Sequence, residues 1–254
     1  MIDGKFSHDN TVPPAKTRVF PLLSLQGRTA IVSGAGAGIG LAVAQALAEA
    51  GANVAIWFNS NRDAIARAKE IEEEYGVKCR AYEVNVCDAD AVEKAVFAQV
   101  EEFNGRLDIF VANAGIPWTE GAIIDGTDMS GQKLQNYSYG SFIATSSMSG
   151  RIVNIPLCQA AYNSAKAGVT HLCKSLAVEW CRYARANAVC PGYVDTEIAN
   201  FVPKDTKSVW KHKIPMGREA MPHELKGVYL FLASDASSYM TGADLVIDGG
   251  YSLP

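Results

Sequence analysis

The chain has 254 residues, of which 48% are hydrophobic and 20% charged, as is typical of a globular protein with one large α/β domain or two small ones. Its formal net charge of −4 argues against a nucleic-acid-binding surface or an anionic membrane as partner. It contains no apolar run of about 18 residues, so no membrane-spanning helix is expected.

The cysteines indicate the redox environment. None forms a CxxC pair or has the spacing of zinc ligands, so no metal site is expected. Ordinary buried thiols in a chain of this length fit a reducing, cytoplasmic location. The six are Cys79, Cys87, Cys158, Cys173, Cys181 and Cys190.

The N-terminal segment differs in character from the rest. Residues 1–21 are polar and proline-bearing, without the continuous apolar stretch of a signal peptide. We expect residues 1–24 to form a flexible extension and residues 25–254 to form one domain.

Short β-branched runs alternate with segments rich in helix formers through most of this domain. Such alternation predicts parallel strands joined by right-handed crossovers, that is, a doubly wound α/β sheet of Rossmann type. Strands are expected at 29–33, 53–58, 79–84, 107–112, 142–146, 184–189 and 245–247, and helices at 41–50, 62–75, 90–103, 159–181 and 224–233.

The crossover between the fourth and fifth strands is incomplete in the sequence. Glycines interrupt the segment 121–140, and no apolar face of period 3.6 can be written there. Parallel strands normally need a helix at this place. One face of the sheet should therefore be partly uncovered, and we expect Ile109 and Val111 to meet water, which would favour association or instability.

A glycine-rich turn links the first strand to the first helix. Gly34, Gly38 and Gly40 let the backbone approach a pyrophosphate, and the helix N-terminus supplies amide donors. The alternative is a tight turn that needs positive φ and binds nothing. The position between strand and helix at the start of an α/β domain favours the dinucleotide site.

Tyr162 and Lys166 are four residues apart and therefore share one face of the predicted helix at 159–181. An ammonium group beside a phenol favours the phenolate, so we expect Lys166 to lower the pKa of Tyr162 and make it a usable proton donor. On its own, this spacing is usually accidental.

Together these features resemble the short-chain dehydrogenase/reductase family, over roughly residues 25–254. Five blocks carry the resemblance: the glycine turn, Asn113-Ala114-Gly115, Ser146-Ser147-Met148-Ser149, Tyr162 to Lys166, and Pro191-Gly192-Tyr193-Val194-Asp195-Thr196. The family also has a long helix at the shortened crossover, carrying a catalytic asparagine and a dimer contact. This chain has no residue at the right distance for that asparagine.

The resemblance implies roles for individual residues. Tyr162 would donate the proton, Lys166 would depress its pKa and hold the ribose hydroxyls, and Ser147 would bind the substrate oxygen. Ser149 is a rival to Ser147, because it is nearer the usual family distance from Tyr162. The remaining cofactor-binding residues implied are Gly34, Gly38, Ile39, Gly40, Asn85, Val86, Asn113, Ala114, Gly115, Pro191, Gly192, Val194 and Thr196, together with Tyr162 and Lys166.

The loop after the second strand indicates which nicotinamide cofactor is bound. An acidic residue there would bind the ribose 2′-hydroxyl and repel a 2′-phosphate. The chain instead has Asn59, Ser60 and Asn61, followed by Arg62, which favour NADP(H) over NAD(H). An ordinary polar loop is the alternative.

A narrower resemblance concerns fungal NADP-dependent sorbose reductases and mannitol dehydrogenases, which interconvert ketoses and polyols. It implies an enzyme acting on a small ketose or polyol, assembled as a dimer or tetramer. The alternative is a folded relic that binds cofactor or forms oligomers without turnover, because the helix is missing. Residues 197–222 are expected to cover the substrate, with Ile198, Phe201 and Trp210 as wall residues or simply as loop packing.

Overall fold

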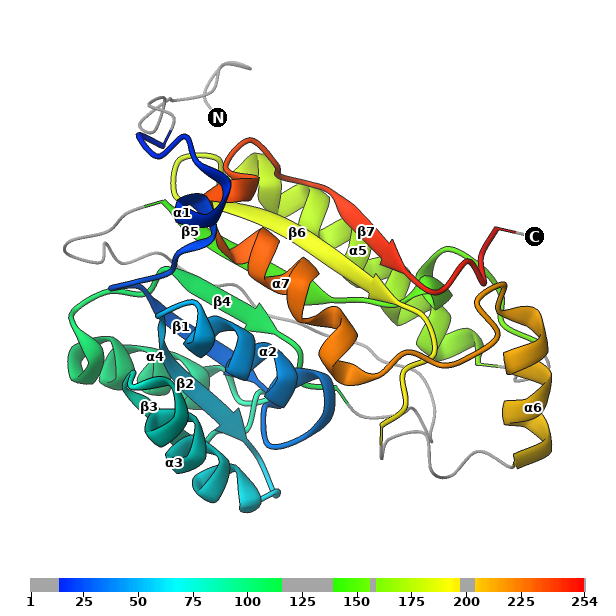
Figure 1. Ribbon diagram of the computed structural model, residues 1–254, viewed down its shortest axis with the longest axis horizontal. Helices are drawn as coiled ribbons and strands as arrows, with labels where there is room; N and C mark the ends of the chain where they lie inside the picture. The colour runs from blue at the N-terminus through cyan, green and yellow to red at the C-terminus, as the bar shows by residue number, and fades with distance from the viewer. Residues whose placement is uncertain (1–13, 116–138, 156–158, 197–203, 254) are drawn as a thin grey trace.

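The computed structural model describes residues 14–115, 139–155, 159–196 and 204–253 (Figure 1). Its strands are β1 (Thr29–Ser33), β2 (Asn53–Phe58), β3 (Cys79–Glu83), β4 (Ile109–Ala112), β5 (Gly140–Thr145), β6 (Ala184–Pro191) and β7 (Asp244–Ile247). Its α-helices are α1 (Val19–Leu23), α2 (Gly38–Glu49), α3 (Asp63–Tyr75), α4 (Ala89–Phe103), α5 (Ala160–Glu179), α6 (Lys204–Lys213) and α7 (Lys226–Ala233). Short 3-10 turns are η1 (Met148–Gly150), η3 (Pro222–Leu225) and η4 (Asp235–Ser237).

The strands form one parallel sheet in the order β3-β2-β1-β4-β5-β6-β7. The chain runs outward from β1 to β3 and then returns to place β4 beside β1. The carboxyl ends of β1 and β4 therefore flank the point where the strand order reverses, the usual binding crevice of such sheets. This confirms the predicted Rossmann-like fold.

One face of the sheet has a continuous core. Strand residues such as Val32, Ile56 and Ile143 pack there with Leu47 of α2 and Leu232 of α7, all fully buried. Figure 1 shows α2 and α7 side by side on this face, where they contact each other. We call it the α2/α7 face.

The opposite face has two separate cores. Trp57 packs with Phe103 of α4, and Ala144 packs with Cys173 of α5. Among the described residues, the two cores meet at a stacked pair, Phe110 and Phe142, whose ring centroids are 6.2 Å apart. We call this the α4/α5 face.

The expected exposure of Ile109 and Val111 is wrong, because both are fully buried on the α2/α7 face. Side chains alternate along a strand, so it is Phe110 that points to the face where the cores are divided. Phe110 and Phe142 are only partly buried. The shortened crossover at 121–140 lies mostly outside the described residues.

Several boundaries differ from expectation. β5 begins at Gly140, and residues 204–213, expected as part of a covering loop, form α6. In Figure 1, α6 lies beyond the carboxyl ends of β6 and β7. Within the expected N-terminal extension, α1 buries no side chain.

Candidate active site

The glycine turn requires glycine for two reasons, its backbone conformation and the space available. Gly34 and Gly38 have φ of +64° and +59°, a region that L side chains rarely adopt. Gly40 is needed for space, because a Cβ there would lie 2.3 Å from the carbonyl oxygen of Gly34 and 2.5 Å from Nδ2 of Asn113. The turn therefore packs directly against the end of β4.

Asn113 joins three strand ends. Its Nδ2 donates to the carbonyl oxygens of Ser33 (3.1 Å) and Gly34 (3.2 Å), and its Oδ1 accepts from Thr145 Oγ1 (3.3 Å). Ser33 Oγ in turn accepts from the backbone amides of Asn113 and Ala114, both at 3.0 Å. These bonds fix β1, β4 and β5 at the edge where the strand order reverses.

The N-terminus of α2 suits an anionic group. Its N-cap residue Ala37 makes no side-chain cap, and its first turn carries no acidic residue. Thr196 approaches this end, with Cγ2 3.5 Å from where a Cβ on Gly38 would lie. Ile39 packs against the α2/α7 core and so anchors the helix start. The amides of this turn can thus receive a pyrophosphate.

The loop after β2 is exposed beside the turn. Asn61 lies next to Gly36, where a Cβ would sit 3.2 Å from Asn61 Nδ2, and Asn61 Oδ1 accepts from the Asp63 amide (3.1 Å). Asn59 and Ser60 are exposed. Arg62 forms a 3.7 Å ion pair with Glu83 at the end of β3, a neighbouring carboxylate that the sequence analysis missed.

Two further predicted cofactor segments lie at strand ends. Asn85 and Val86 follow β3 and are exposed, with Asn85 Oδ1 accepting from the Cys87 amide at 3.0 Å. Ala114 and Gly115 follow β4 and are also exposed. Both segments border the edge that carries the glycine turn.

Ser147 and Tyr162 are brought together. Tyr162 lies in the first turn of α5, and Ser147 lies just before η1. Burial raises the pKa of Tyr162, and a side-chain hydrogen bond with Ser147 opposes that rise. The net shift of this pKa is upward rather than downward, because desolvation of the phenol is the largest effect. An effect of Lys166 on the Tyr162 pKa stays a prediction.

Lys166 lies near Tyr162 but donates elsewhere. Its Nζ is 5.7 Å from the centroid of the Tyr162 ring and donates to the carbonyl oxygen of Thr145 at 2.9 Å. Burial lowers the pKa of Lys166. The ammonium is thus held at the end of β5 by a backbone acceptor that the sequence analysis did not identify.

The rival Ser149 is engaged in other contacts. Its backbone amide donates to Ser147 Oγ (3.1 Å), and its Oγ accepts from Gln159 Nε2 (3.3 Å). Of the two serines, Ser147 is the one that affects the pKa of Tyr162. This favours Ser147 as the third member of the predicted group.

The segment after β6 forms the remaining wall. Pro191 ends β6, and a Cβ on Gly192 would lie 2.7 Å from the Cα of Asp248, so only glycine fits there. Val194 forms a bridge with Ala220, and Thr196 Oγ1 bonds the Val194 carbonyl oxygen at 3.5 Å. The segment is therefore tied to β7 and to the chain before α7.

An aromatic cluster follows Gly192. Tyr193 stacks on Trp210 of α6, with ring centroids 3.9 Å apart, and its hydroxyl accepts from Asn154 Nδ2 at 3.1 Å. Oδ1 of Asn154 and Nε1 of Trp210 are buried and have no hydrogen-bond partner among the described residues. The other expected wall residues, Ile198 and Phe201, lie outside the described residues.

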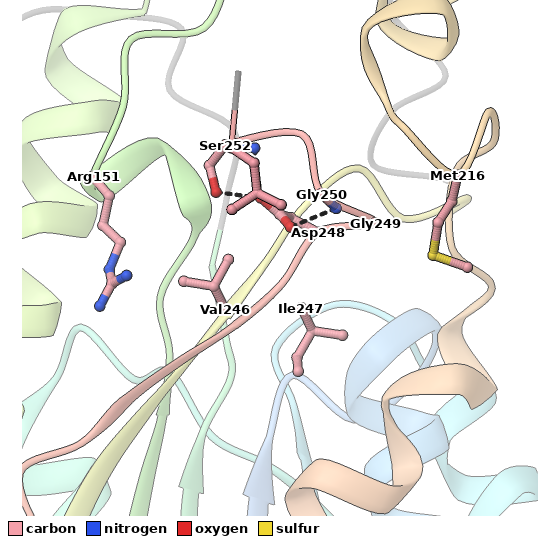
Figure 2. Close-up of a pocket in the computed structure, with 9 residues that line it drawn as sticks. Arg151, Met216, Val246, Ile247, Asp248, Gly249, Gly250 and Ser252 are labelled. Atoms are coloured by element: carbon pink, nitrogen blue, oxygen red, sulfur yellow. Dashed lines mark hydrogen bonds between the residues drawn. The ribbon is translucent and has the colours of Figure 1, made fainter.

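A hollow of about 460 Å³ lies at the end of β7 (Figure 2). Its lining includes Arg151, Met216 and Asp248 but none of the predicted catalytic residues. Its polar groups are already paired. Arg151 bonds Asp244 at 2.6 Å, and hydrogen bonds from Ser252 and Gly250 outweigh burial and lower the pKa of Asp248.

The fold and the site together define a dinucleotide-binding oxidoreductase with a serine, a tyrosine and a lysine at the carboxyl edge of the sheet. The family model described as "Enoyl-(Acyl carrier protein) reductase" matches residues 34–252. The chain belongs to the short-chain dehydrogenase/reductase family.

Individual relatives agree. An L-xylulose reductase of Hypocrea jecorina is 58% identical and covers 100% of both chains. A probable NADP-dependent mannitol dehydrogenase of Yarrowia lipolytica is 48% identical, covering 96% of this chain and 94% of its own. The crystal structure of an NADPH-dependent 3-quinuclidinone reductase from Rhodotorula rubra has a TM-score of 0.84 and 36% identity, covering 98% of this chain and 100% of its own.

The alignment with the Hypocrea protein runs over 288 positions, 34 more than the 254 residues of this chain. That relative therefore has residues without a counterpart here, in agreement with a shortened chain. Among the described residues, no helix is long and apolar enough to cross a membrane, and no cluster of His, Cys, Asp or Glu forms a metal site.

Proposed function

We propose that this protein is an NADP(H)-dependent oxidoreductase that interconverts a ketose or small carbonyl compound with its alcohol or polyol. The observation that carries the proposal is the grouping of three side chains: the Lys166 ammonium lies 5.7 Å from the centroid of the Tyr162 ring, and Ser147 is close enough to oppose the raised pKa of Tyr162. These three groups lie at the same sheet edge as the glycine turn. The names of the Hypocrea and Yarrowia relatives support the substrate class.

Each of these residues has a separate role in the proposed reaction. Bound NADPH supplies the hydride. Tyr162 donates its proton to the substrate oxygen, and Ser147 hydrogen-bonds that oxygen and orients it against the phenol. Because burial raises the pKa of Tyr162, the phenol keeps its proton at neutral pH, as reduction requires. Lys166 offers a cation beside the ring, which favours loss of that proton.

The binding residues fit the cofactor. The glycine turn and the uncapped N-terminus of α2 receive the pyrophosphate, with Thr196 beside it. Asn59, Ser60 and Asn61 are exposed donors at the end of β2, suited to a 2′-phosphate. Asn85, Val86, Asn113, Ala114 and Gly115 border the adenine and the central crevice, and Pro191, Gly192 and Val194 border the nicotinamide.

The alternative of a folded relic without turnover is less well supported. Ser147, Tyr162 and Lys166 are not merely retained but arranged around one another. Both curated relatives described above carry enzyme names, a reductase and a dehydrogenase.

The test is a matrix of substrates and cofactors. Purified protein is incubated with L-xylulose, fructose, sorbose and small ketones, each with NADPH and with NADH, and absorbance at the reduced-nicotinamide band is followed. We expect turnover of at least one ketose, faster with NADPH. Binding of NADPH without turnover of any carbonyl compound would support the relic instead.

We further propose a homo-oligomer located in the cytoplasm. Leu172 and Val178 of α5 are 51% and 44% exposed, an apolar surface on a helix that buries few residues of its own. Sedimentation velocity of the full chain measures the assembly, and a monomer at micromolar concentration would contradict it. Fractionation of the source cells tests the location.

A further inference from the structure

A fully buried phenol on α7 is hydrogen-bonded to the end of β5, next to the proposed active site. Tyr229 has none of its surface exposed and lies in the continuous core of the α2/α7 face. Burial raises the pKa of Tyr229 far above the ordinary value, so its hydroxyl stays protonated. The partner of that hydroxyl is Thr145 Oγ1, at 2.7 Å.

The direction of this bond follows from the next one. Thr145 has a single hydroxyl proton, and Thr145 Oγ1 donates it to Asn113 Oδ1 at 3.3 Å. Tyr229 must then be the donor to Thr145. Asn113 extends this series of hydrogen bonds, because its Nδ2 donates to the carbonyl oxygens of Ser33 and Gly34. A directed series of hydrogen bonds therefore leads from α7 to the glycine turn.

Thr145 also holds the lysine. Its backbone carbonyl oxygen accepts from Lys166 Nζ at 2.9 Å. Thr145 therefore makes two contacts. Its backbone binds the proposed catalytic cation, and its side chain is linked to the glycine turn through Asn113. A contact that holds Thr145 in place therefore also holds the Lys166 ammonium and Asn113 in place.

We propose that Tyr229 is a positioning residue for this reaction, which acts through Thr145 to hold Lys166 in place and to keep Asn113 against the glycine turn. The inference builds on the proposed function and extends it to a residue that touches neither substrate nor cofactor. A phenylalanine would fill the same apolar volume. The hydroxyl adds only the bond to Thr145, and a buried hydroxyl is costly unless it is bonded.

The test compares Tyr229→Phe with the wild type in kcat, KM, the dissociation constant for NADPH, and the pH profile of kcat. We expect kcat/KM to fall about 2- to 12-fold, the effect of one net hydrogen bond. We also expect weaker NADPH binding and a displaced pH profile, because the cation beside Tyr162 is less firmly held. Thermal unfolding is measured alongside.

Two further variants separate positioning from packing. Thr145→Val removes the shared hydroxyl, and in that background Tyr229→Phe should have no further effect on kcat/KM, since both changes break the same bond. Tyr139→Phe is the matched control. Its hydroxyl bonds the Cys181 carbonyl oxygen at 2.9 Å, at the opposite end of β5, and its loss should leave the pH profile and the NADPH affinity unchanged.

The proposal is overturned if Tyr229→Phe lowers only the unfolding temperature, as a packing residue would, or if its effect adds fully to that of Thr145→Val. Failure of the proposed function looks different, because the wild type itself would then turn over no carbonyl compound. In that case the change in NADPH affinity still decides whether Tyr229 supports the glycine turn.

Discussion

The two faces of the sheet are built differently. On the α2/α7 face, α2 buries seven of its 12 residues, four of them in one continuous core. On the α4/α5 face, α5 buries three of its 20 residues, and two smaller cores meet at the Phe110–Phe142 pair. Yet α5 is the helix that carries Tyr162 and Lys166.

The α2/α7 face mainly contributes stability, whereas the α4/α5 face carries the proposed catalytic groups. The dense face fixes the glycine turn through packing, as the tight fit of Gly40 shows. The α4/α5 face positions the proposed catalytic groups through single polar contacts at strand ends, such as that from Lys166 to the Thr145 carbonyl oxygen. Loss of apolar atoms on the α2/α7 face should therefore mainly change the unfolding free energy, whereas loss of the polar groups that meet at the strand ends, the Tyr229 hydroxyl included, should change turnover.

The sharpest test is Tyr162→Phe. Loss of the proton donor should lower kcat by about 10²- to 10⁴-fold. The unfolding temperature and NADPH affinity should stay near those of the wild type, because the ring is retained. Single-turnover kinetics and NADPH fluorescence titration measure the two effects.

Tyr82→Phe is the control, since its hydroxyl bonds Glu102 at 2.7 Å on the outer strand β3. It should leave turnover intact. Persistent turnover of the Tyr162 variant would rule out the assigned donor.

Substitutions at two adjacent residues of β5 allow a direct comparison of the packing on the two faces. Ile143 is fully buried on the α2/α7 face, and Phe142 is partly buried on the other. Ile143→Ala should cost about 2–5 kcal/mol of unfolding free energy. Phe142→Ala should cost less, although more atoms are removed.

Urea denaturation of both variants measures the difference. An equal or larger loss for Phe142→Ala would show that the α4/α5 face is as well packed as its counterpart. The comparison of the two faces would then fail.

Gly40→Ala tests the tight turn. The added Cβ overlaps the Gly34 carbonyl oxygen, so α2 must shift, at a cost of about 1–3 kcal/mol. NADPH should bind more weakly, as isothermal titration would detect. Gly227→Ala in α7 is the matched control, because a Cβ there meets nothing within 4 Å. It should not lower stability; equal losses in both variants would show that crowding at the turn is not the cause.

The smallest expected effect concerns pH. Ser147 opposes the raised pKa of Tyr162, so Ser147→Ala should raise that pKa further. Reduction needs the protonated phenol and is lost as pH rises through its pKa. The alkaline limb of the reduction profile should therefore move to higher pH, and the rise of the oxidation profile should move the same way.

Ser149→Ala should leave both limbs in place, because Ser149 bonds Gln159 instead. A shift in the Ser149 variant and none in the Ser147 variant would exchange their roles.

The sequence predicted the elements of the fold well because their signals are local. Alternation of strands and helices gave the parallel sheet, and the i, i+4 spacing placed Tyr162 and Lys166 on one face of α5. It missed α6, whose sequence is mostly polar and charged and has few apolar residues. It also missed Tyr229, where the only signal was a hydroxyl within an otherwise apolar helical run.

By itself, then, the sequence determined the type and order of most elements and the glycine turn, and it supplied the residues that are proposed as reacting groups. Only the tertiary structure decided that Ile109 is buried while Phe110 lies between two cores, that Ser147 rather than Ser149 meets Tyr162, and that Thr145 holds Lys166. The reason is physical: these contacts join residues on different strands and helices, and strand pairing and helix packing bring them together in ways that no local pattern specifies.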